Sequence, residues 1–228
     1  MIEKIKEIAY DTLEDYLFRL TELKDACIAF SSSLSWEDQV ITHAIFSQDL
    51  PIRVFTLDTG RLFPETYSVL EATRQRYQKP LEVYFPQHEA VEELVTQKGP
   101  ISFYESVENR KECCFIRKVE PLNRALENVD VWVTGLRAGH SENRHELTLV
   151  EEDRGRGIIK VNPLVSWSLE EVKAYVRKHQ IPGNVLQDRG FVSLGCQPCT
   201  RAIREGEPFR AGRWWWEDNS KKECGLHG

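Results

Sequence analysis

Residues 26–35 read Ala26-Cys-Ile-Ala-Phe30-Ser31-Ser-Ser-Leu-Ser35, a short apolar run followed at once by a serine-rich stretch. Runs of this length and polarity are typical of a strand buried inside a sheet. Ser35 stands three residues before Asp38, a spacing that resembles the capping box at the start of a helix. The stretch therefore predicts a buried strand, a polar loop at its carboxyl end, and a helix that continues to residue 47.

The same alternation continues along the chain. Apolar runs predict strands at 52–57, 81–85 and 131–134, and helices are predicted at 3–23, 64–77, 87–97 and 112–128. Strands that alternate with helices favour an α/β fold, with a mostly parallel sheet and helices on both faces. Ligands of such sheets bind at the carboxyl ends of the strands. Those ends carry the serine loop, Asp58-Thr-Gly60 and Thr134-Gly-Leu-Arg137.

The regular alternation of predicted strands and helices ends after residue 145. Residues 147–161 predict an antiparallel hairpin, and 166–179 predict a helix that begins with a capping box of Ser168 and Glu171. From residue 183 onward there is little periodicity, but the stretch is rich in cysteine, tryptophan and arginine. Such a composition argues against a disordered linker. We therefore expect an α/β domain over 1–183 and a C-terminal segment over 184–228 that folds over a site.

Composition narrows the class of protein. The 228 residues carry a net charge of −6, which argues against a nucleic-acid partner because nucleic-acid-binding domains are usually basic. No apolar stretch is long enough for a membrane span, and the charged N-terminus lacks the apolar core of a signal peptide. The sequence therefore predicts a cytoplasmic protein. A homo-oligomer is compatible with it.

Six cysteines are present, and in a reducing compartment spaced cysteines favour metal binding or catalysis over disulfides. Cys196-Gln-Pro-Cys199 is a C-x-x-C motif, and Cys113-Cys114 lies near the start of the predicted helix 112–128. Four thiolates in two pairs suit either zinc or a 4Fe–4S cluster, and the spacing alone leaves both open.

The other two cysteines have different surroundings. Cys27 lies in an apolar strand and is predicted to be part of the core. Cys224 lies near the end of the chain, close to two lysines that would lower its pKa and favour the reactive thiolate. An inert exposed thiol is the alternative for Cys224.

Several longer motifs resemble the assimilatory adenylyl-sulfate reductases, within the larger family that includes the phosphoadenylyl-sulfate reductases. The resemblance extends from about residue 24 to residue 227. It is carried by Leu57-Asp-Thr-Gly-Arg-Leu62, Cys113-Cys114 with Arg117 and Lys118, Thr134-Gly135 with Arg137, Gly195-Cys-Gln-Pro-Cys-Thr-Arg201, Gly212-Arg-Trp-Trp-Trp-Glu217 and Lys222-Glu-Cys-Gly-Leu-His227.

The resemblance implies a fold like that of the adenine-nucleotide alpha hydrolases, so that residues 1–183 would form the nucleotide-binding domain. The modified phosphate loop would be Ser31–Ser35, although many relatives have glycine where this chain has serines. The resemblance also implies that the four paired cysteines hold a 4Fe–4S cluster. Because members that use the 3′-phosphorylated nucleotide usually lack these cysteines, it points to adenosine 5′-phosphosulfate (APS) as substrate.

The implied reaction reduces APS to sulfite and AMP through a thiosulfonate on Cys224, which thioredoxin or glutaredoxin then releases. Basic and hydroxyl groups would bind the phosphosulfate; the candidates are Ser31, Ser33, Lys118, Arg137, Arg144, Arg210 and Arg213. Lys118, four residues after Cys114, would share that cysteine's helix face. At least two of the three tryptophans of 214–216 are expected to pack in the interior.

Three other functions stay open at this point. One is reduction of the 3′-phosphorylated substrate, alone or together with APS. Another is an ATP-cleaving enzyme that adenylates its substrate, which would need a glycine-rich loop that Ser31–Ser35 does not supply. The last is a zinc-stabilised nucleotide-binding protein without catalytic activity.

Overall fold

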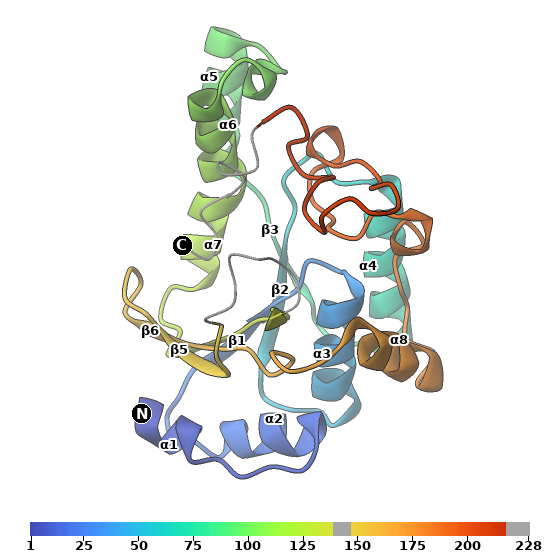
Figure 1. Cartoon of the computed structure of the whole chain (residues 1–228). Coiled ribbons are helices and arrows are strands. Elements are labelled where there is room, and N and C mark those ends of the chain that lie inside the picture. The colour runs from blue at the N-terminus through green and yellow to red at the C-terminus, as the bar shows by residue number, and fades with distance from the viewer. Residues whose placement is uncertain (139–146, 218–228) are drawn as a thin grey trace. The chain divides into compact units, whose positions relative to one another are not determined.

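The computed structural model describes residues 1–138 and 147–217 and contains a six-stranded sheet (Figure 1). Its order is β3-β2-β1-β4-β6-β5. β1 is parallel to β2 and β4, β4 is parallel to β6, and β5 pairs antiparallel with β6. The predicted α/β fold with a mostly parallel sheet is confirmed. The strands are β1 (Ile28–Ser31), β2 (Arg53–Leu57), β3 (Glu82–Tyr84), β4 (Val131–Val133), β5 (Val150–Asp153) and β6 (Ile158–Val161).

The described chain forms two compact units. The first contains residues 1–56, 65–82 and 128–185, and the second contains 57–64, 83–127 and 186–217. The predicted boundary at residues 183 and 184 stays a prediction. The α-helices are α1 (Ile2–Lys6), α2 (Leu13–Thr21), α3 (Trp36–Ser47), α4 (Pro64–Tyr77), α5 (His88–Lys98), α6 (Val107–Cys114), α7 (Glu120–Ala125) and α8 (Leu169–Lys178).

The core of the first unit is apolar. Phe30 from β1, Ile41 from α3 and Val133 from β4 are fully buried members of one continuous cluster. α3 packs against α2 and α8. α8 begins as predicted, because Ser168 and Glu171 form both hydrogen bonds of a capping box. Burial of aliphatic and aromatic side chains therefore holds this unit together.

Two local predictions for the first unit are wrong. The helix expected over 3–23 is divided into α1 and α2, because the Thr12 side chain accepts a hydrogen bond from Asp15 N and starts a new helix. The capping box expected at Ser35 does not form. The Asp38 carboxylate instead accepts a hydrogen bond from Ser33 N, at 2.6 Å, so it stabilises the loop before the helix.

The second unit has shorter elements and a small interior. The predicted helix 112–128 begins earlier, at a cap formed by Ser106, and is interrupted by η2 (Phe115–Val119), a π-helical turn between α6 and α7. Cys113 and Cys114 therefore lie at the end of α6, not near a helix start as predicted. Single helical turns complete this unit: η1 (Ser102–Tyr104), η5 (Gln187–Arg189) and η6 (Gln197–Cys199).

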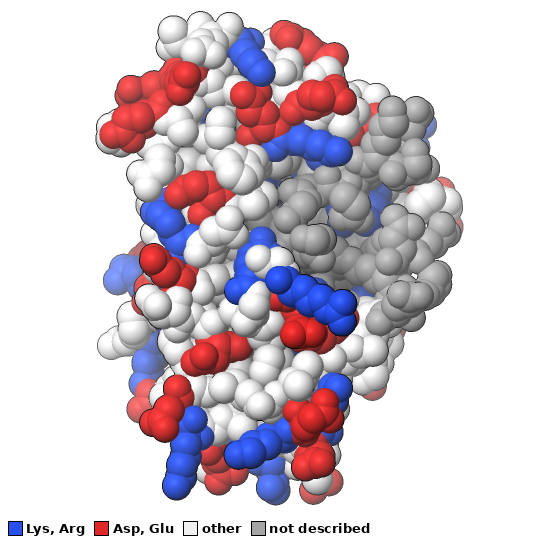
Figure 2. All heavy atoms as spheres, turned by 90° about the vertical axis from the view of Figure 1, so that its left-hand side faces the viewer, with Lys and Arg blue, Asp and Glu red and all other residues white. Residues whose placement is uncertain are grey.

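On the face drawn in Figure 2, acidic and basic side chains of the described residues are interspersed and form no basic stripe. Within residues 1–138 and 147–217, no helix is long and apolar enough to span a membrane.

Candidate active site

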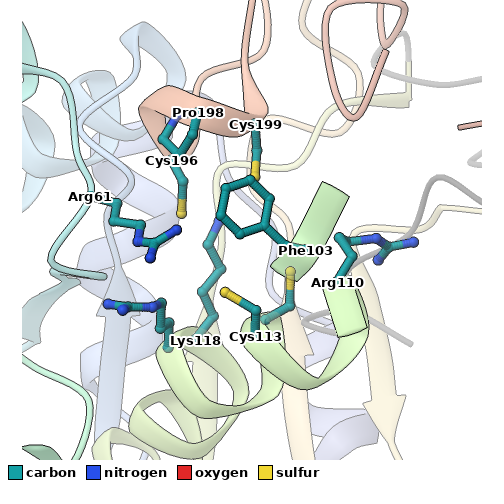
Figure 3. Close-up of a pocket in the computed structure, with 10 residues that line it drawn as sticks. Arg61, Phe103, Arg110, Cys113, Lys118, Cys196, Pro198 and Cys199 are labelled. Carbon is teal, nitrogen blue, oxygen red and sulfur yellow. The ribbon is translucent and has the colours of Figure 1, made fainter. Parts of the chain in front are cut away.

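The second unit brings the four paired cysteines to one place. Cys113 and Cys114 end α6, while Cys196 precedes η6 and Cys199 ends it. η6 is a single turn that contains Pro198, and Thr200 donates its hydroxyl to Cys196 O at 2.9 Å. All four thiols line a single small pocket, and Figure 3 shows the Cys196 and Cys199 sulfur atoms facing the side on which Cys113 lies. Segments about 80 residues apart therefore supply the two halves of one thiol cluster.

Four cationic side chains line the same pocket. They are Arg61, Arg110, Arg117 and Lys118, the last of which runs along the pocket in Figure 3. Arg117 donates to Thr59 O at 2.7 Å, and Arg61 lies over the Phe103 ring at 5.0 Å. Positive groups beside thiols favour the thiolate form, which is the form that binds metals.

The local charges act differently on the individual thiols. Burial alone would raise the pKa of Cys196, but the charge of Lys118, a hydrogen bond with Thr59 and the charges of two arginines outweigh it, so this pKa is lowered. Burial and the charge of Cys196 raise the pKa of Cys199 to about 12. Burial also raises the pKa of Cys113. Metal binding at these thiols would therefore release protons.

We tested whether a 4Fe–4S cluster fits these residues. In the described ranges, no three His, Cys, Asp or Glu side chains are arranged to hold a single metal ion. Among the described residues, the buried N–H donors without a hydrogen-bond partner include Arg117 Nε, Arg213 Nε and Trp214 Nε1. Trp214 packs with Cys114, Cys196 and Cys199. The sulfur atoms of a 4Fe–4S cluster, both the sulfides and the cysteine thiolates, can accept hydrogen bonds. The thiols and the buried donors around them therefore fit a 4Fe–4S cluster, and the donors alone do not exclude zinc.

The C-terminal segment packs around the thiol cluster. Thr200 and Arg213 form an antiparallel bridge, and Trp214 N donates to Cys199 O at 3.2 Å. Arg213 donates to Leu194 O at 3.0 Å, and a Cβ atom on Gly195 would meet its guanidinium at 2.4–2.5 Å. A glycine at 195 is thus needed for the guanidinium to occupy this place.

The tryptophan run divides as predicted. Trp214 is fully buried, and three guanidinium groups lie near its ring, those of Arg110 at 4.6 Å, Arg213 at 4.7 Å and Arg210 at 5.7 Å from the ring centroid. Trp216 packs against the same cluster, whereas Trp215 is 40% exposed. The prediction that at least two of the three pack against the rest of the protein is confirmed, with Trp214 buried and Trp216 partly buried.

The serine loop belongs to the first unit. Ser31 accepts a hydrogen bond from Trp132 Nε1 at 2.9 Å, and the Ser33 hydroxyl contacts the Asp38 carboxylate. The left-handed backbone conformation of this loop falls on Leu34, with φ 63°, so none of the serines has to adopt it. Burial raises the pKa of Asp38 to about 6, although hydrogen bonds from Ser33 oppose this. The loop is held by its own hydrogen bonds.

Arg137 is buried in the first unit. Its guanidinium forms an ion pair with Glu37 at 3.0 Å and also donates to Trp167 O at 3.2 Å. Both side chains of the pair are 5% exposed. These contacts account for a structural role, and a role in substrate binding stays a prediction.

Comparison with known proteins places this geometry in a family. The profile of the phosphoadenosine phosphosulfate reductase domain matches residues 27–202. The chain belongs to this family. Adenosine 5′-phosphosulfate reductase from Burkholderia cepacia is 51% identical over 217 residues, covering 95% of this chain and 86% of that protein. The protein of the same name from Sinorhizobium fredii (strain NBRC 101917 / NGR234) is 52% identical over 198 residues, covering 87% of this chain and 79% of that protein.

A solved structure gives the same result. The crystal structure of phosphoadenylyl-sulfate (PAPS) reductase from Candida auris, a phosphate complex, aligns with a TM-score of 0.72 and 27% sequence identity. The alignment covers 88% of this chain and 95% of that one. The expected family and fold are therefore confirmed for this member of the phosphoadenosine phosphosulfate reductase domain family.

The prediction for Cys27 of this family member is wrong, and two other predicted residues are not among the described ones. Cys27 is exposed and does not belong to the core as predicted. It lies just before β1, which begins at Ile28, and its backbone N–H donates to the Asp130 carboxylate. Arg144 and Cys224 lie outside the described residues.

Sequence reasoning assigned no role to several residues around the thiols. Thr59 Oγ1 lies 3.2 Å from Cys196 Sγ, and Arg117 lines the thiol pocket. Both residues belong to motifs that the sequence analysis singled out. Their positions in Asp58-Thr-Gly60 and next to Lys118 were the available signals. Arg61 and Arg110 also line the pocket. For Arg110, no pattern in the sequence indicated such a place.

Proposed function

We propose that this protein is an adenylyl-sulfate reductase that converts APS to sulfite and AMP, using thiols as reductant, in assimilatory sulfate reduction in the cytoplasm. The observation that carries the proposal is the pocket where four cysteines from two distant segments meet Lys118, Arg61 and Arg117. The names of the relatives at about 50% identity support APS as the substrate.

In the proposed reaction, the Cys224 thiolate attacks the sulfur of the phosphosulfate anhydride, and AMP leaves with the electrons of the broken S–O bond. A thiol of a thioredoxin or glutaredoxin then attacks the Cys224 sulfur, which releases sulfite and leaves a mixed disulfide. The second thiol of that partner resolves the mixed disulfide. The partner's dithiol supplies both electrons, and Cys224 returns to its thiol form.

The residues of the chain would bind and orient the substrate. Lys118, Arg210 and Arg213 would neutralise the charge on the phosphosulfate, together with Arg144. Ser31 and Ser33 would offer hydroxyls to phosphate or sulfate oxygens, in competition with their present hydrogen bonds. Arg137 ranks after the other basic side chains as a candidate for binding the phosphosulfate.

Cys113, Cys114, Cys196 and Cys199 would hold the 4Fe–4S cluster. When bound, the cluster would supply a fixed local charge and a rigid support for the surrounding residues, without serving as an electron relay. A cluster whose redox state cycles during turnover would contradict this part of the proposal.

The function is tested by measuring sulfite release from APS with a dithiol reductant. We expect turnover by the wild-type protein, and none by Cys224→Ser, which should keep the absorbance of the cluster. Turnover by Cys224→Ser would show that the mechanism is wrong.

The 3′-phosphorylated nucleotide is the second candidate substrate, favoured by the likeness to the Candida auris enzyme. A higher kcat/KM for that nucleotide than for APS would establish this alternative. A colourless protein with stoichiometric zinc and no turnover would instead indicate a non-catalytic nucleotide-binding protein.

A further inference from the structure

A fully buried ion pair joins α6 to the end of the described C-terminal segment. Arg110 donates to both carboxylate oxygens of Glu217, through Nε at 2.9 Å and through Nη2 at 2.8 Å. The two side chains are 0% and 4% exposed. Two parallel hydrogen bonds from a planar guanidinium fix the direction of the carboxylate as well as its distance.

Arg110 contacts other parts of the site as well. Its guanidinium lies over the Trp214 ring at 4.6 Å and hydrogen-bonds the side chain of Cys114, one helical turn further along α6. Glu217 N donates to Trp214 O at 2.9 Å, which closes the turn that carries the carboxylate. One guanidinium thus contacts a thiol of the cluster and both ends of the 214–217 turn.

Stability alone does not explain this pair. Moving both charges out of water is costly, and replacing a buried ion pair with apolar residues of similar size is often neutral or stabilising. A buried, bidentate ion pair does, however, hold the two segments that it joins in one relative orientation. Here it holds Glu217, the last described residue, in a fixed orientation against α6.

We propose that the Arg110–Glu217 pair is a positioning device, which sets the direction in which the chain leaves the thiol cluster toward Cys224. This inference rests on the proposed function, in which Cys224 is the nucleophile. Cys224 follows Glu217 by seven residues, so its sulfur has to act within about 25 Å of Glu217.

The length of this tether does not by itself give the pair a large effect. Without the pair, the last backbone anchor would be Trp214, whose N–H is bonded to Cys199 O, and the tether would lengthen from seven residues to ten. The effective concentration of a tethered group falls roughly as the −3/2 power of tether length, which gives about a twofold loss. Orientation is more demanding, because small misplacement of a nucleophile can cost up to about a hundredfold in rate.

The main test uses the double variant Arg110→Met with Glu217→Met, which removes the pair without leaving a buried charge. A single-turnover experiment with APS and no reductant measures how fast the Cys224 thiosulfonate forms, by mass spectrometry. We expect about a tenfold lower rate at saturating APS, an unchanged half-saturating APS concentration, and unchanged iron and sulfide content. Glu217→Gln should slow the same step.

The matched control is Glu207→Gln. Glu207 accepts two hydrogen bonds from Arg201 in the same C-terminal segment, at 2.8 and 2.9 Å, and Arg201 does not line the thiol pocket. This variant should react at the wild-type rate.

Three outcomes would overturn the inference: a wild-type rate in the double variant, an equal loss in Glu207→Gln, or loss of iron in step with loss of rate. The last would mean that the pair only supports the metal centre. If the wild-type protein itself formed no thiosulfonate from APS, the proposed function would fail instead.

Discussion

The two units of this protein differ in what fills their interiors. In the first unit, aliphatic and aromatic side chains from β1, α3 and β4 form one continuous cluster. In the second, the small cluster consists largely of cysteine and tryptophan, and charged side chains such as Arg110 and Lys118 are buried around it. A buried cation is costly unless it is paired, as Arg110 is with Glu217, and thiolates can balance the cations that line the thiol pocket. We therefore expect apolar burial to stabilise the first unit, and the group that the thiols are proposed to hold to contribute more to the second.

The largest expected effect is on the second unit alone. Replacing Cys199 by Ser should abolish iron binding and sulfite release, because the proposed 4Fe–4S cluster would lose one of its four ligands. Hydrogen exchange, followed by mass spectrometry, should speed up in peptides from 107–119 and 186–217 and stay unchanged in β1 and β4.

Cys27→Ala is the control for this experiment, because Cys27 is exposed. It should retain all iron and activity. If exchange in Cys199→Ser accelerated equally in both units, the proposed difference between them would not hold.

The opposite dependence is expected for the first unit. Ile41→Ala removes a fully buried side chain from the apolar cluster and should lower the free energy of unfolding by about 2–5 kcal/mol. Denaturant unfolding measures this loss, and the iron content of the folded protein should not change. Phe18→Ala, at a position that is 50% exposed, should cost far less. Loss of iron in folded Ile41→Ala would contradict the prediction that iron binding does not depend on the apolar cluster of the first unit.

A smaller effect concerns the polar loop of the first unit. Because the pKa of Asp38 is raised from 3.8 to about 6, the folded protein binds this proton more tightly than the unfolded chain does. The stabilisation from this proton is fully present below about pH 3.8 and is lost as the pH rises through about 6. Between about pH 4 and about pH 7, Asp38→Asn should gain at most about 3 kcal/mol relative to wild type.

Unfolding free energies of wild type and Asp38→Asn at several pH values measure this gain. A difference between the two proteins that is independent of pH would show that burial does not dominate at Asp38. The iron content of Asp38→Asn should match wild type at each pH, since Asp38 belongs to the other unit.

The sequence predicted the first unit better than the second, for a physical reason. Apolar runs in the sequence predict β1, β2 and β4, because a strand that is buried in a parallel sheet needs apolar residues along its length. The wrong predictions in this unit arose where a side chain could form either of two local hydrogen bonds. Asp38, for example, accepts a hydrogen bond from Ser33 N and does not cap α3.

In the second unit, the cysteines were found because their spacing is unusual, but their neighbours were not. Arg110 is one arginine among many in the sequence, and only the fold brings Glu217, 107 residues later, against it. Tertiary contacts of this kind leave no local pattern. The π-helical turn after Cys114 likewise has no periodic signal that separates it from the α-helices on either side.

The interleaving of the two units has a consequence for biosynthesis. The second unit is assembled from three separate stretches, and its first two thiols are synthesised about 80 residues before Cys196 and Cys199. During translation, Cys113 and Cys114 are therefore made before β4, β6 and α8 of the other unit, and Cys196 and Cys199 are made after them. The four thiols can come together only when nearly the whole chain has left the ribosome. Neither unit corresponds to a contiguous fragment, so a product truncated before residue 196 would carry only half of the thiol cluster.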